Sequence, residues 1–371
     1  MSLKKIYLLL AILFTLLVGC KESIVGPLPN HVPELRGFNY TSFTADGFLQ
    51  GGQHNAIEEL KTQIDNNWIS LCIFEYQESA FSTNMAPNTT GINPLNDSSW
   101  STTSTEEDIR DGVHQARLHQ MNIMLKPQVD VYTNEWRAAI HPDNEGAWFA
   151  SYTSMMLKYA RLAEELHLEM FCIGTEYIVA TQHMYIGQWR SLIAAIRRMY
   201  TGKLIYAANW SGAYAYGLSR PEFEQVEFWN ELDDIGIDAY YPLINSKSDS
   251  IPLFETALAR AITDVQEIGS LSSLHHRPVI ITEIGIQSVK GALATPWDYS
   301  LGAVSGAVQD NEVQKFYYRV MIDAIGKQSW CSGIFWWNWE SVPTANESTN
   351  YTPRNKPAAV TLRQWYSNPA F

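Results

Sequence analysis

The chain has 371 residues, of which 46% are hydrophobic and 18% charged, with 22 Gly and 16 Pro. This composition excludes a disordered chain and a collagen-like chain. The formal net charge of −13 argues against a nucleic-acid partner, because phosphate binding requires clustered Lys and Arg. The 13 Trp, 19 Tyr and 14 Phe exceed what a core of this size requires. Flat apolar rings in such number often line a ligand cleft.

Residues 1–20 have the pattern of a secretory signal peptide. Lys4 and Lys5 precede an apolar run over residues 6–18, which is too short to span a bilayer as a helix of the mature protein. The sequence Leu-Val-Gly-Cys that ends at Cys20 resembles the lipobox of bacterial lipoproteins. This resemblance implies that Cys20 is acylated and becomes the new N-terminus. The alternative is plain secretion with a cysteine there by chance.

We therefore expect an exported bacterial lipoprotein at the outer membrane or the cell surface. Lys21 follows Cys20 where an Asp would favour retention in the inner membrane. Residues 21–34 contain three prolines and are expected to form a short extended tether. A membrane contact is expected only through this N-terminal lipid anchor.

Residues 35–371 alternate between strand-like and helix-like patterns. Between the strand-like runs, apolar residues step by three or four, as in Ile57, Leu60 and Ile64, and Ser104 with Glu107 predicts a capping box. The strand-like runs begin about 42 residues apart on average, the spacing of repeated βα units. The eight runs are Arg36–Tyr40, Trp68–Tyr76, Asn122–Val131, Met170–Tyr177, Leu204–Trp210, Asp234–Pro242, Pro278–Ile286 and Cys331–Glu340. Eight such units predict an α/β fold, a single (β/α)8 TIM barrel that forms one catalytic domain.

Three long connections follow the second, seventh and eighth strand-like runs, at residues 77–103, 287–309 and 341–356. All three are expected at the C-terminal face of the barrel, where active sites of this fold lie. The alternative is that they are neutral insertions. Trp100 and Trp297 lie within two of them and favour a cleft.

Two glutamates end apolar strand-like runs. Glu176 ends the fourth run and Glu283 the seventh. A buried carboxylate is unfavourable without partners or a function, and two at the same face are a stronger signal than one. Glycoside hydrolysis needs such a pair, one protonated to assist the leaving group and one ionised to attack the anomeric carbon.

With these glutamates, the chain resembles clan A retaining glycoside hydrolases, and most closely glycoside hydrolase family 113, the β-mannanases. The motifs that carry the resemblance are Arg36-Gly37-Phe38-Asn39, Met124-Leu125-Lys126-Pro127, Gly174-Thr175-Glu176, Thr282-Glu283-Ile284-Gly285, the eighth run Gly333-Ile334-Phe335-Trp336-Trp337-Asn338-Trp339 and Lys356-Pro357-Ala358. The resemblance implies hydrolysis of β-1,4-linked mannan or mannooligosaccharides by double displacement. It assigns Glu176 as acid/base and Glu283 as nucleophile. Thr175 stands where clan A enzymes commonly have Asn, which leaves the sugar preference open.

Further candidates for substrate binding lie at strand ends: Lys126, Trp136, Asn209, Trp210, Tyr240, Tyr241, Trp337 and Trp339. Lys126 is expected either to bond a sugar hydroxyl or to form a salt bridge within the barrel. Family resemblance implies that a tyrosine near the end of the sixth run bonds the nucleophile, and alternation does not choose between Tyr240 and Tyr241. Period-2 alternation predicts that Trp337 and Trp339 share one face, with Trp337 as the sugar platform.

Other chemistries lack their residues. The chain has no HExxH motif, no Gly-rich phosphate loop and no Gly-x-Ser-x-Gly elbow, so neither a metal nor a cofactor is expected. Cys72, Cys172 and Cys331 are expected to be buried free thiols.

The expected partner is a polysaccharide or oligosaccharide substrate. Two alternatives remain: another clan A activity such as a β-glucanase or other hemicellulase, and a non-catalytic surface glycan-binding lipoprotein. The carboxylate pair favours catalysis, because binding alone does not require it.

Overall fold

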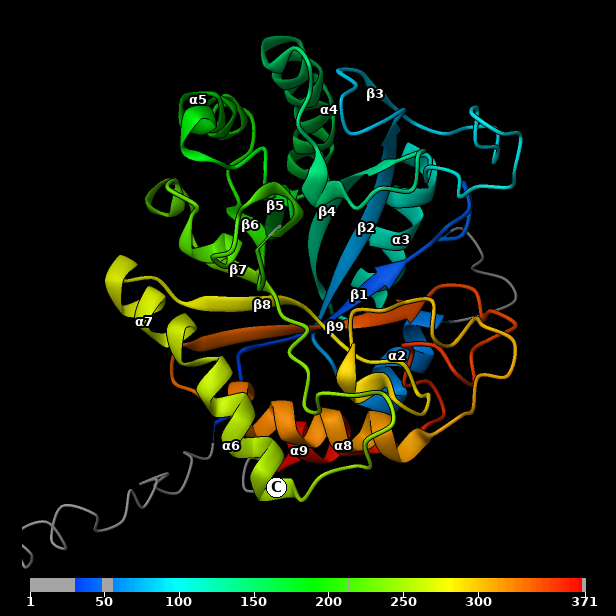
Figure 1. Cartoon of the computed structure of the whole chain (residues 1–371). Coiled ribbons are helices and arrows are strands. Elements are labelled where there is room, and N and C mark those ends of the chain that lie inside the picture. Colours follow the sequence, from blue (N-terminus) through cyan, green and yellow to red (C-terminus); the bar gives the residue numbers. More distant parts are fainter. Residues whose placement is uncertain (1–30, 49–55, 213, 369–371) are drawn as a thin grey trace, which may run out of the picture.

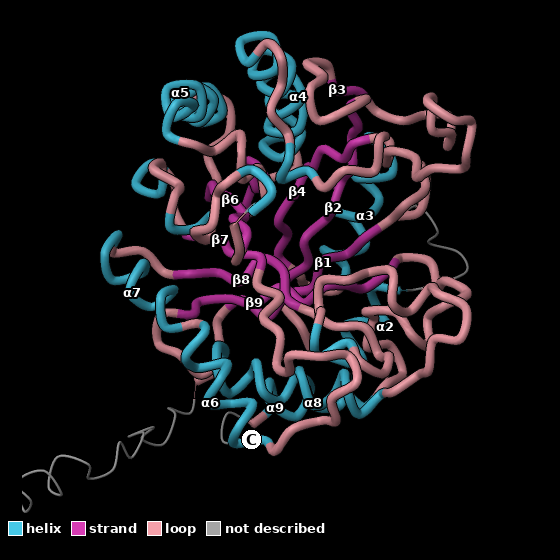
Figure 2. The backbone as a smooth tube through the Cα atoms, in the orientation of Figure 1, coloured by secondary structure: helices cyan, strands magenta, loops and turns pink. Residues whose placement is uncertain are grey.

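The computed structural model describes residues 31–48, 56–212 and 214–368, so the predicted signal peptide, Cys20 and most of the predicted tether lie outside the described residues. In the described part, eight parallel strands close into a barrel (Figures 1 and 2). They are β1 (Leu35–Thr41), β2 (Trp68–Gln77), β4 (Asn122–Val131), β5 (Met170–Thr175), β6 (Lys203–Asn209), β7 (Ile235–Asp238), β8 (Val279–Ile284) and β9 (Cys331–Glu340). The predicted (β/α)8 barrel is thus confirmed, with one strand overlapping each of the eight predicted runs.

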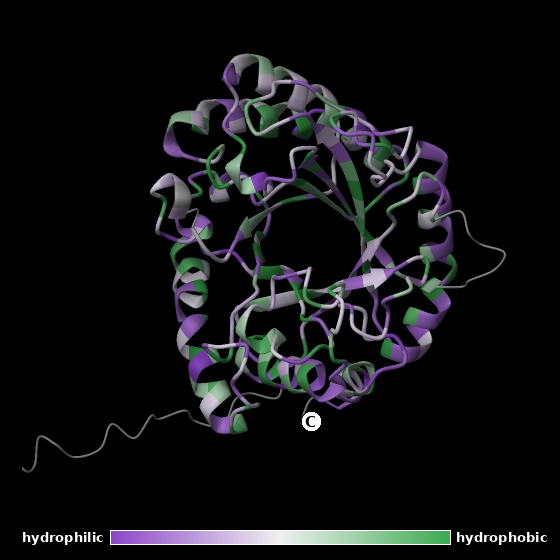
Figure 3. Ribbon diagram, turned by 45° about the vertical axis from the view of Figure 1, so that its right-hand side comes forward, coloured by the Kyte–Doolittle hydropathy of each residue, from purple (hydrophilic) through white to green (hydrophobic). Residues whose placement is uncertain are grey.

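The helices surround this ring, as the view along the barrel shows (Figure 3). They are α2 (Ala56–Ile64), α3 (Glu106–Leu118), α4 (Glu145–Glu165), α5 (Ile186–Arg197), α6 (Phe254–Asp264), α7 (Gln266–His275), α8 (Asn311–Met321) and α9 (Pro357–Ser367). The predicted buried face of α2, formed by Ile57, Leu60 and Ile64, is buried. Apolar residues at this spacing form one stripe against the strands, which is what holds each helix to the barrel.

The connection between β6 and β7 departs from the repeating pattern. Its described residues form the short 3₁₀ turns Tyr214–Tyr216, Glu222–Glu224 and Trp229–Glu231 in place of an α-helix. Gly212, Gly217 and Pro221 interrupt this segment, and these residues oppose a continuous helix. The following connection instead contains two helices, α6 and α7.

The start of α3 differs by one residue from the predicted capping box. Thr105, and not Ser104, is the N-cap, and its side chain accepts a hydrogen bond from the Asp108 amide at 3.1 Å. Thr105 and Asp108 have the same spacing as Ser104 and Glu107, so the motif alone did not distinguish them.

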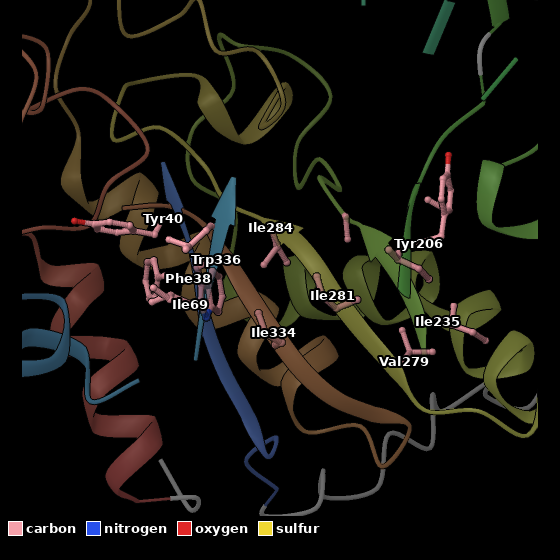
Figure 4. Close-up of a cluster of buried hydrophobic side chains, with 14 of the residues drawn as sticks. Phe38, Tyr40, Ile69, Tyr206, Ile235, Val279, Ile281, Ile284, Ile334 and Trp336 are labelled. Atoms are coloured by element: carbon pink, nitrogen blue, oxygen red, sulfur yellow. The ribbon is translucent and has the colours of Figure 1, made fainter. Parts of the chain in front are cut away.

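The apolar core has two layers. The larger lies between strands and helices, and Figure 4 shows part of it, including Phe38, Ile281 and Trp336. The smaller fills the barrel interior, with residues such as Trp68, Met170 and Phe335. Toward the C-terminal ends of the strands the inward side chains become polar and include Lys126, Asp238 and Glu283, all buried. The barrel is therefore packed at its N-terminal side and holds its polar groups at the opposite mouth.

The loops after β8 and β9 are fastened to each other. Lys356 Nζ donates to Ser288 Oγ at 2.8 Å and to the Asn350 carbonyl at 3.2 Å. Thr349 Oγ1 donates to the Gly302 carbonyl at 2.8 Å. These contacts join two of the three predicted long loops into one wall.

The first described residues lie at the N-terminal side of the barrel. The His31 ring lies 3.0 Å from the carbonyl oxygen of Cys331, the first residue of β9. Trp365 Nε1 of α9 donates to the His31 carbonyl at 3.3 Å. The chain thus enters the domain on the face opposite the polar mouth.

Two further predictions can be checked against the described residues. Cys72, Cys172 and Cys331 are free and buried, as expected. Among helices in the described ranges, none combines the length and apolarity needed to cross a membrane.

Candidate active site

The two predicted glutamates lie at neighbouring points of the mouth. Glu176 directly follows β5, and Glu283 lies near the end of β8. Burial raises the pKa of Glu176, and the negative charge of Glu283 raises it further. Arg137 and hydrogen bonds from Trp136 and Asn209 oppose this rise. Burial and the neighbouring Glu283 carboxylate together therefore favour a proton on Glu176.

Glu176 is held by two neutral donors. Asn209 Nδ2, at the end of β6, donates to Oε1 at 2.5 Å, and Trp136 Nε1 donates to Oε2 at 3.1 Å. The backbone of Glu176 is left-handed, with φ of 56°, and its amide donates to the Ala207 carbonyl at 2.9 Å. Residues other than glycine rarely adopt this backbone conformation, and those that do are concentrated at functional sites.

Glu283 is held by a cation and a phenol. Lys126 Nζ, from β4, lies 2.5 Å from Oε1, and Tyr240 Oη donates to Oε2 at 2.8 Å. Burial by itself would lower the pKa of Lys126, but Asp238 and Glu283 raise it above its ordinary value. The Lys126 ammonium therefore lies directly against Oε1 of Glu283.

Asp238, the last residue of β7, completes this buried charge group. It lies 3.5 Å from Lys126 Nζ and accepts a hydrogen bond from Thr282 Oγ1 at 2.6 Å. Burial raises the pKa of Asp238, Glu283 raises it further, and Lys126 opposes the rise. Sequence reasoning missed Asp238, although it ends an apolar strand just as Glu176 and Glu283 do.

The structure decides between the alternatives for Lys126 and for the tyrosine pair. Lys126 is fully buried and forms a salt bridge with Glu283 and Asp238, which is one of the two roles predicted for it. Tyr240 is the tyrosine that bonds Glu283. Tyr241 instead packs in the outer core, with its ring centroid 4.9 Å from that of Trp210.

The prediction that Trp337 and Trp339 share a face is wrong. Trp337 is partly exposed and packs against a small cluster that includes Phe74 at the mouth, whereas Trp339 is fully buried among the helices. The pairing between β1 and β9 shifts after Phe38–Trp336, so that two residues of β9 stand against one of β1 before Tyr40 pairs with Trp339. Such a bulge reverses the alternation. Trp339 is therefore inaccessible to a substrate, while Trp337 stays a candidate.

Aromatic side chains gather at two places on the C-terminal side. The Tyr132 cluster consists of Tyr76, Trp100 and Tyr132, in which the two tyrosines stack with ring centroids 5.1 Å apart. The Trp297 cluster consists of Trp210, Tyr241 and Trp297, in which the two indoles lie 5.6 Å apart. Trp100 and Trp297 come from the long loops after β2 and β8, as predicted, whereas Tyr76 and Tyr132 were not singled out from the sequence.

Arg137 is the charged residue near Glu176 that sequence reasoning missed. It forms an ion pair with Asp130 at 2.5 Å and also bonds Gln128. It lies in a short turn directly after Trp136, where no periodic pattern marks it. Its guanidinium is the cation that opposes the raised pKa of Glu176.

The chemistry available here is that of paired carboxyl groups. No cluster of His, Cys, Asp and Glu within the described ranges is arranged to hold a metal ion. One carboxyl group has a raised pKa and neutral donors, and the other faces an ammonium group. Such a pair can supply a general acid and a nucleophile or base to one bond.

The chain matches the model of one known protein family. The model of "Glycoside Hydrolase Family 113" matches residues 38–356. A search of curated protein sequences gave no match.

Solved structures share the fold. The family 113 β-mannanase of Alicyclobacillus acidocaldarius, in complex with ManMIm, is 24% identical with a TM-score of 0.73, over 91% of this chain and 99% of that one. Another family 113 β-1,4-mannanase is 22% identical with a TM-score of 0.72, at the same coverage. A β-glucuronidase of Ruminococcus gnavus is 12% identical with a TM-score of 0.56, over 90% of this chain and 50% of that one. At these identities the likeness shows a common fold.

Proposed function

Since the chain belongs to glycoside hydrolase family 113 and is a glycoside hydrolase, we propose that it hydrolyses β-1,4-linked mannan or mannooligosaccharides with retention of anomeric configuration. The observation that carries the proposal is the unlike pair of glutamates at the mouth. Glu176 has a raised pKa, and Glu283 accepts a hydrogen bond from the Lys126 ammonium at 2.5 Å.

In the first step, Glu283 attacks the anomeric carbon while Glu176 gives its proton to the glycosidic oxygen. The bond to the leaving sugar breaks as an ester bond to Glu283 forms. In the second step, Glu176, now ionised, takes a proton from water, and the water oxygen displaces Glu283 from the sugar. The product keeps the configuration of the substrate, and both carboxyl groups return to their starting states.

Lys126 and Tyr240 serve Glu283 in this scheme. Their hydrogen bonds to the two carboxylate oxygens fix the orientation of the nucleophile before the substrate arrives. Fixed groups of this kind need no reorganisation at the moment of reaction, which is where most of their benefit arises.

A polymeric glycan is the substrate class that the mouth supports. The Tyr132 and Trp297 clusters present rings on which sugar faces can stack. The family 113 neighbours described as β-1,4-mannanases point to mannan. Thr175, which stands where clan A enzymes commonly have Asn, is fully buried, and its hydroxyl lies 4.0 Å from the Cys172 sulfur.

A panel of glycans tests this proposal. The purified protein is incubated with mannan, mannooligosaccharides, β-glucans and xylan, the released sugars are identified, and their initial anomeric form is followed by NMR. We expect mannooligosaccharides of β configuration. Release from β-glucan alone would replace the substrate assignment, release of the α anomer would replace the retaining mechanism, and no release from any glycan would favour a binding protein.

For location, we propose that residues 1–20 direct export and that Cys20 anchors the protein by a lipid at the outer membrane or cell surface. The support is the sequence pattern: two lysines, an apolar run and a terminal Cys. The substrate proposed here fits such a location, because polymeric glycans do not enter the cell intact.

A further inference from the structure

Glu222 is a buried carboxyl group that the mechanism above does not use. It lies in the 3₁₀ turn Glu222–Glu224 between β6 and β7 and is fully buried. No salt bridge to it occurs among the residues that the structure describes. Its carboxyl group instead accepts hydrogen bonds from three neutral donors: the Asn209 backbone amide at 2.7 Å, Tyr206 Oη at 2.6 Å and Thr181 Oγ1 at 3.0 Å. A buried carboxyl group without a cation is unfavourable, and such groups are retained where they have a function.

Two of these partners lead directly to Glu176. The Asn209 backbone amide donates to Glu222 Oε2, and the Asn209 side chain donates to Glu176 Oε1. Tyr206 donates to Glu222, and its oxygen accepts the amide hydrogen of Tyr177, the residue after Glu176, at 2.9 Å. Glu222 is thus connected to the Glu176 side chain through Asn209 and to the backbone directly after Glu176 through Tyr206.

The third partner fixes the segment that follows. Thr181 lies in the turn after Glu176, and its amide donates to the Tyr177 carbonyl at 2.8 Å. Glu176 itself has left-handed backbone and is not part of the regular strand. Its position therefore depends on contacts of this kind and not on the β-sheet ladder alone.

We propose that Glu222 is a positioning residue for Glu176, which it places through Asn209 and Tyr206 so that the acid can reach the leaving-group oxygen. This inference rests on the proposed function. Burial raises the pKa of Glu222 to about 8, against the opposing hydrogen bonds from Asn209, Tyr206 and Thr181. Below that pH the Glu222 carboxyl group is neutral. Its O–H can then donate a hydrogen bond to a neighbouring hydroxyl, because hydroxyl groups both donate and accept hydrogen bonds. A glutamine should therefore replace it well.

The test uses the different demand of leaving groups for acid assistance. Aryl β-mannobiosides with a dinitrophenyl group need no proton at the departing oxygen, whereas those with a methylumbelliferyl group do. For Glu222→Ala, we expect kcat/KM to fall on the order of tenfold or more with the methylumbelliferyl substrate and less than about threefold with the dinitrophenyl substrate. Glu222→Gln should stay within about threefold of the wild type on both.

Two control variants separate the role of Glu222 from the proposed function itself. Glu224→Ala changes an acidic residue in the same turn that pairs with Arg220 at the surface, and it should leave both substrates unaffected. Glu176→Ala must show the same selective loss, and larger. If Glu176→Ala is not selective, the proposed function fails; if it is selective and Glu222→Ala is not, only the role of Glu222 fails.

A second variant decides the matter if Glu222→Ala does not fold. Tyr206→Phe keeps the ring and removes only the hydroxyl that joins Glu222 to Tyr177. It should show the same selective loss with an unchanged circular dichroism spectrum. Equal losses on both substrates, or no loss on either, would overturn the proposal.

Discussion

Glu176 and Glu283 are chemically identical side chains in different surroundings. Glu176 is bonded by an indole and an amide, and Glu283 by an ammonium and a phenol. The sequence predicted both residues, because each is an acidic residue at the end of an apolar strand. The sequence also singled out all four of these partners, as candidates for substrate binding. It missed Arg137 and Asp238, because they come from other segments and only the closed barrel brings them near.

The nucleophile is tested by Glu283→Ala. Turnover should fall on the order of 10³-fold or more, because no covalent intermediate can form. Azide should restore part of the activity and give a glycosyl azide of α configuration, the inverse of the substrate. Glu176→Ala with azide is the matched comparison and should give the β-azide instead. Full activity of Glu283→Ala without azide would contradict the assignment.

The acid is tested by Trp136→Phe. The indole hydrogen bond stabilises ionised Glu176, so its loss should raise the pKa of Glu176. Because the acid must be protonated to work, the basic limb of kcat/KM against pH should move to higher pH. Trp297→Phe removes an indole nitrogen that has no such contact with Glu176 and should leave that limb in place. An unchanged basic limb, or one at lower pH, in Trp136→Phe would show that the indole hydrogen bond does not stabilise the ionised form of Glu176.

At the scale of elements, the strands were predictable and the irregular segments were not. Each strand is a short apolar run. Because this apolar pattern is a local property of the sequence, it was enough to locate the strand. The bulge in β9 depends on pairing with β1, and the absence of a helix between β6 and β7 depends on Gly212, Gly217 and Pro221 acting together. Period-2 alternation therefore predicted the wrong face for Trp339, and the βα repeat pattern did not predict the 3₁₀ turn that contains Glu222.

The end of β8 tolerates no side chain at Gly285. A Cβ there would lie 2.1 Å from the Trp337 carbonyl oxygen, a backbone atom that cannot move aside. We expect Gly285→Ala to lower the free energy of unfolding by about 2 kcal/mol or more and to reduce activity through Glu283, two residues away. Denaturant unfolding and kcat/KM measure the two effects.

Gly187 provides the matched control for that variant. It lies in α5, and a Cβ there would meet nothing within 4 Å. Gly187→Ala should stabilise the protein by about 0.5–1 kcal/mol, because alanine favours a helix. If both variants are equally stable, the close approach between β8 and β9 is not rigid.

Lys356, which joins the loops after β8 and β9, should make the free energy of unfolding depend on pH. Burial lowers the pKa of Lys356 from its ordinary 10.5 to about 7. Between these values the unfolded chain binds this proton and the folded chain does not, so the free energy of unfolding should rise with pH. Lys356→Met should flatten that rise by up to about 1.4 kcal/mol per pH unit between pH 8 and 10. Lys315→Met on α8, an exposed position, should leave the slope unchanged.

For the whole molecule, length, composition and the repeat of strand-like runs were enough to predict one barrel with its active face. Family resemblance added the roles of the two glutamates, which geometry supports through their unlike partners. Residues 1–20 carry the prediction of export, and that prediction depends on the sequence alone.

The lipid anchor is tested by Cys20→Ala in cells. The wild-type protein should fractionate with membranes and take up labelled fatty acid, whereas the variant should do neither while its glycan hydrolysis stays unchanged. A variant that remains with the membranes and labelled would show that another residue is modified.

The position of His31 has a consequence for how an anchored enzyme would face its surroundings. His31 is held at the start of β9, on the side of the barrel away from Glu176 and Glu283, and only ten residues lie between it and Cys20. Such a link spans at most about 40 Å when fully stretched. Attached by this underside, the domain would stand with its catalytic opening directed outward, where long glycan chains arrive from the medium.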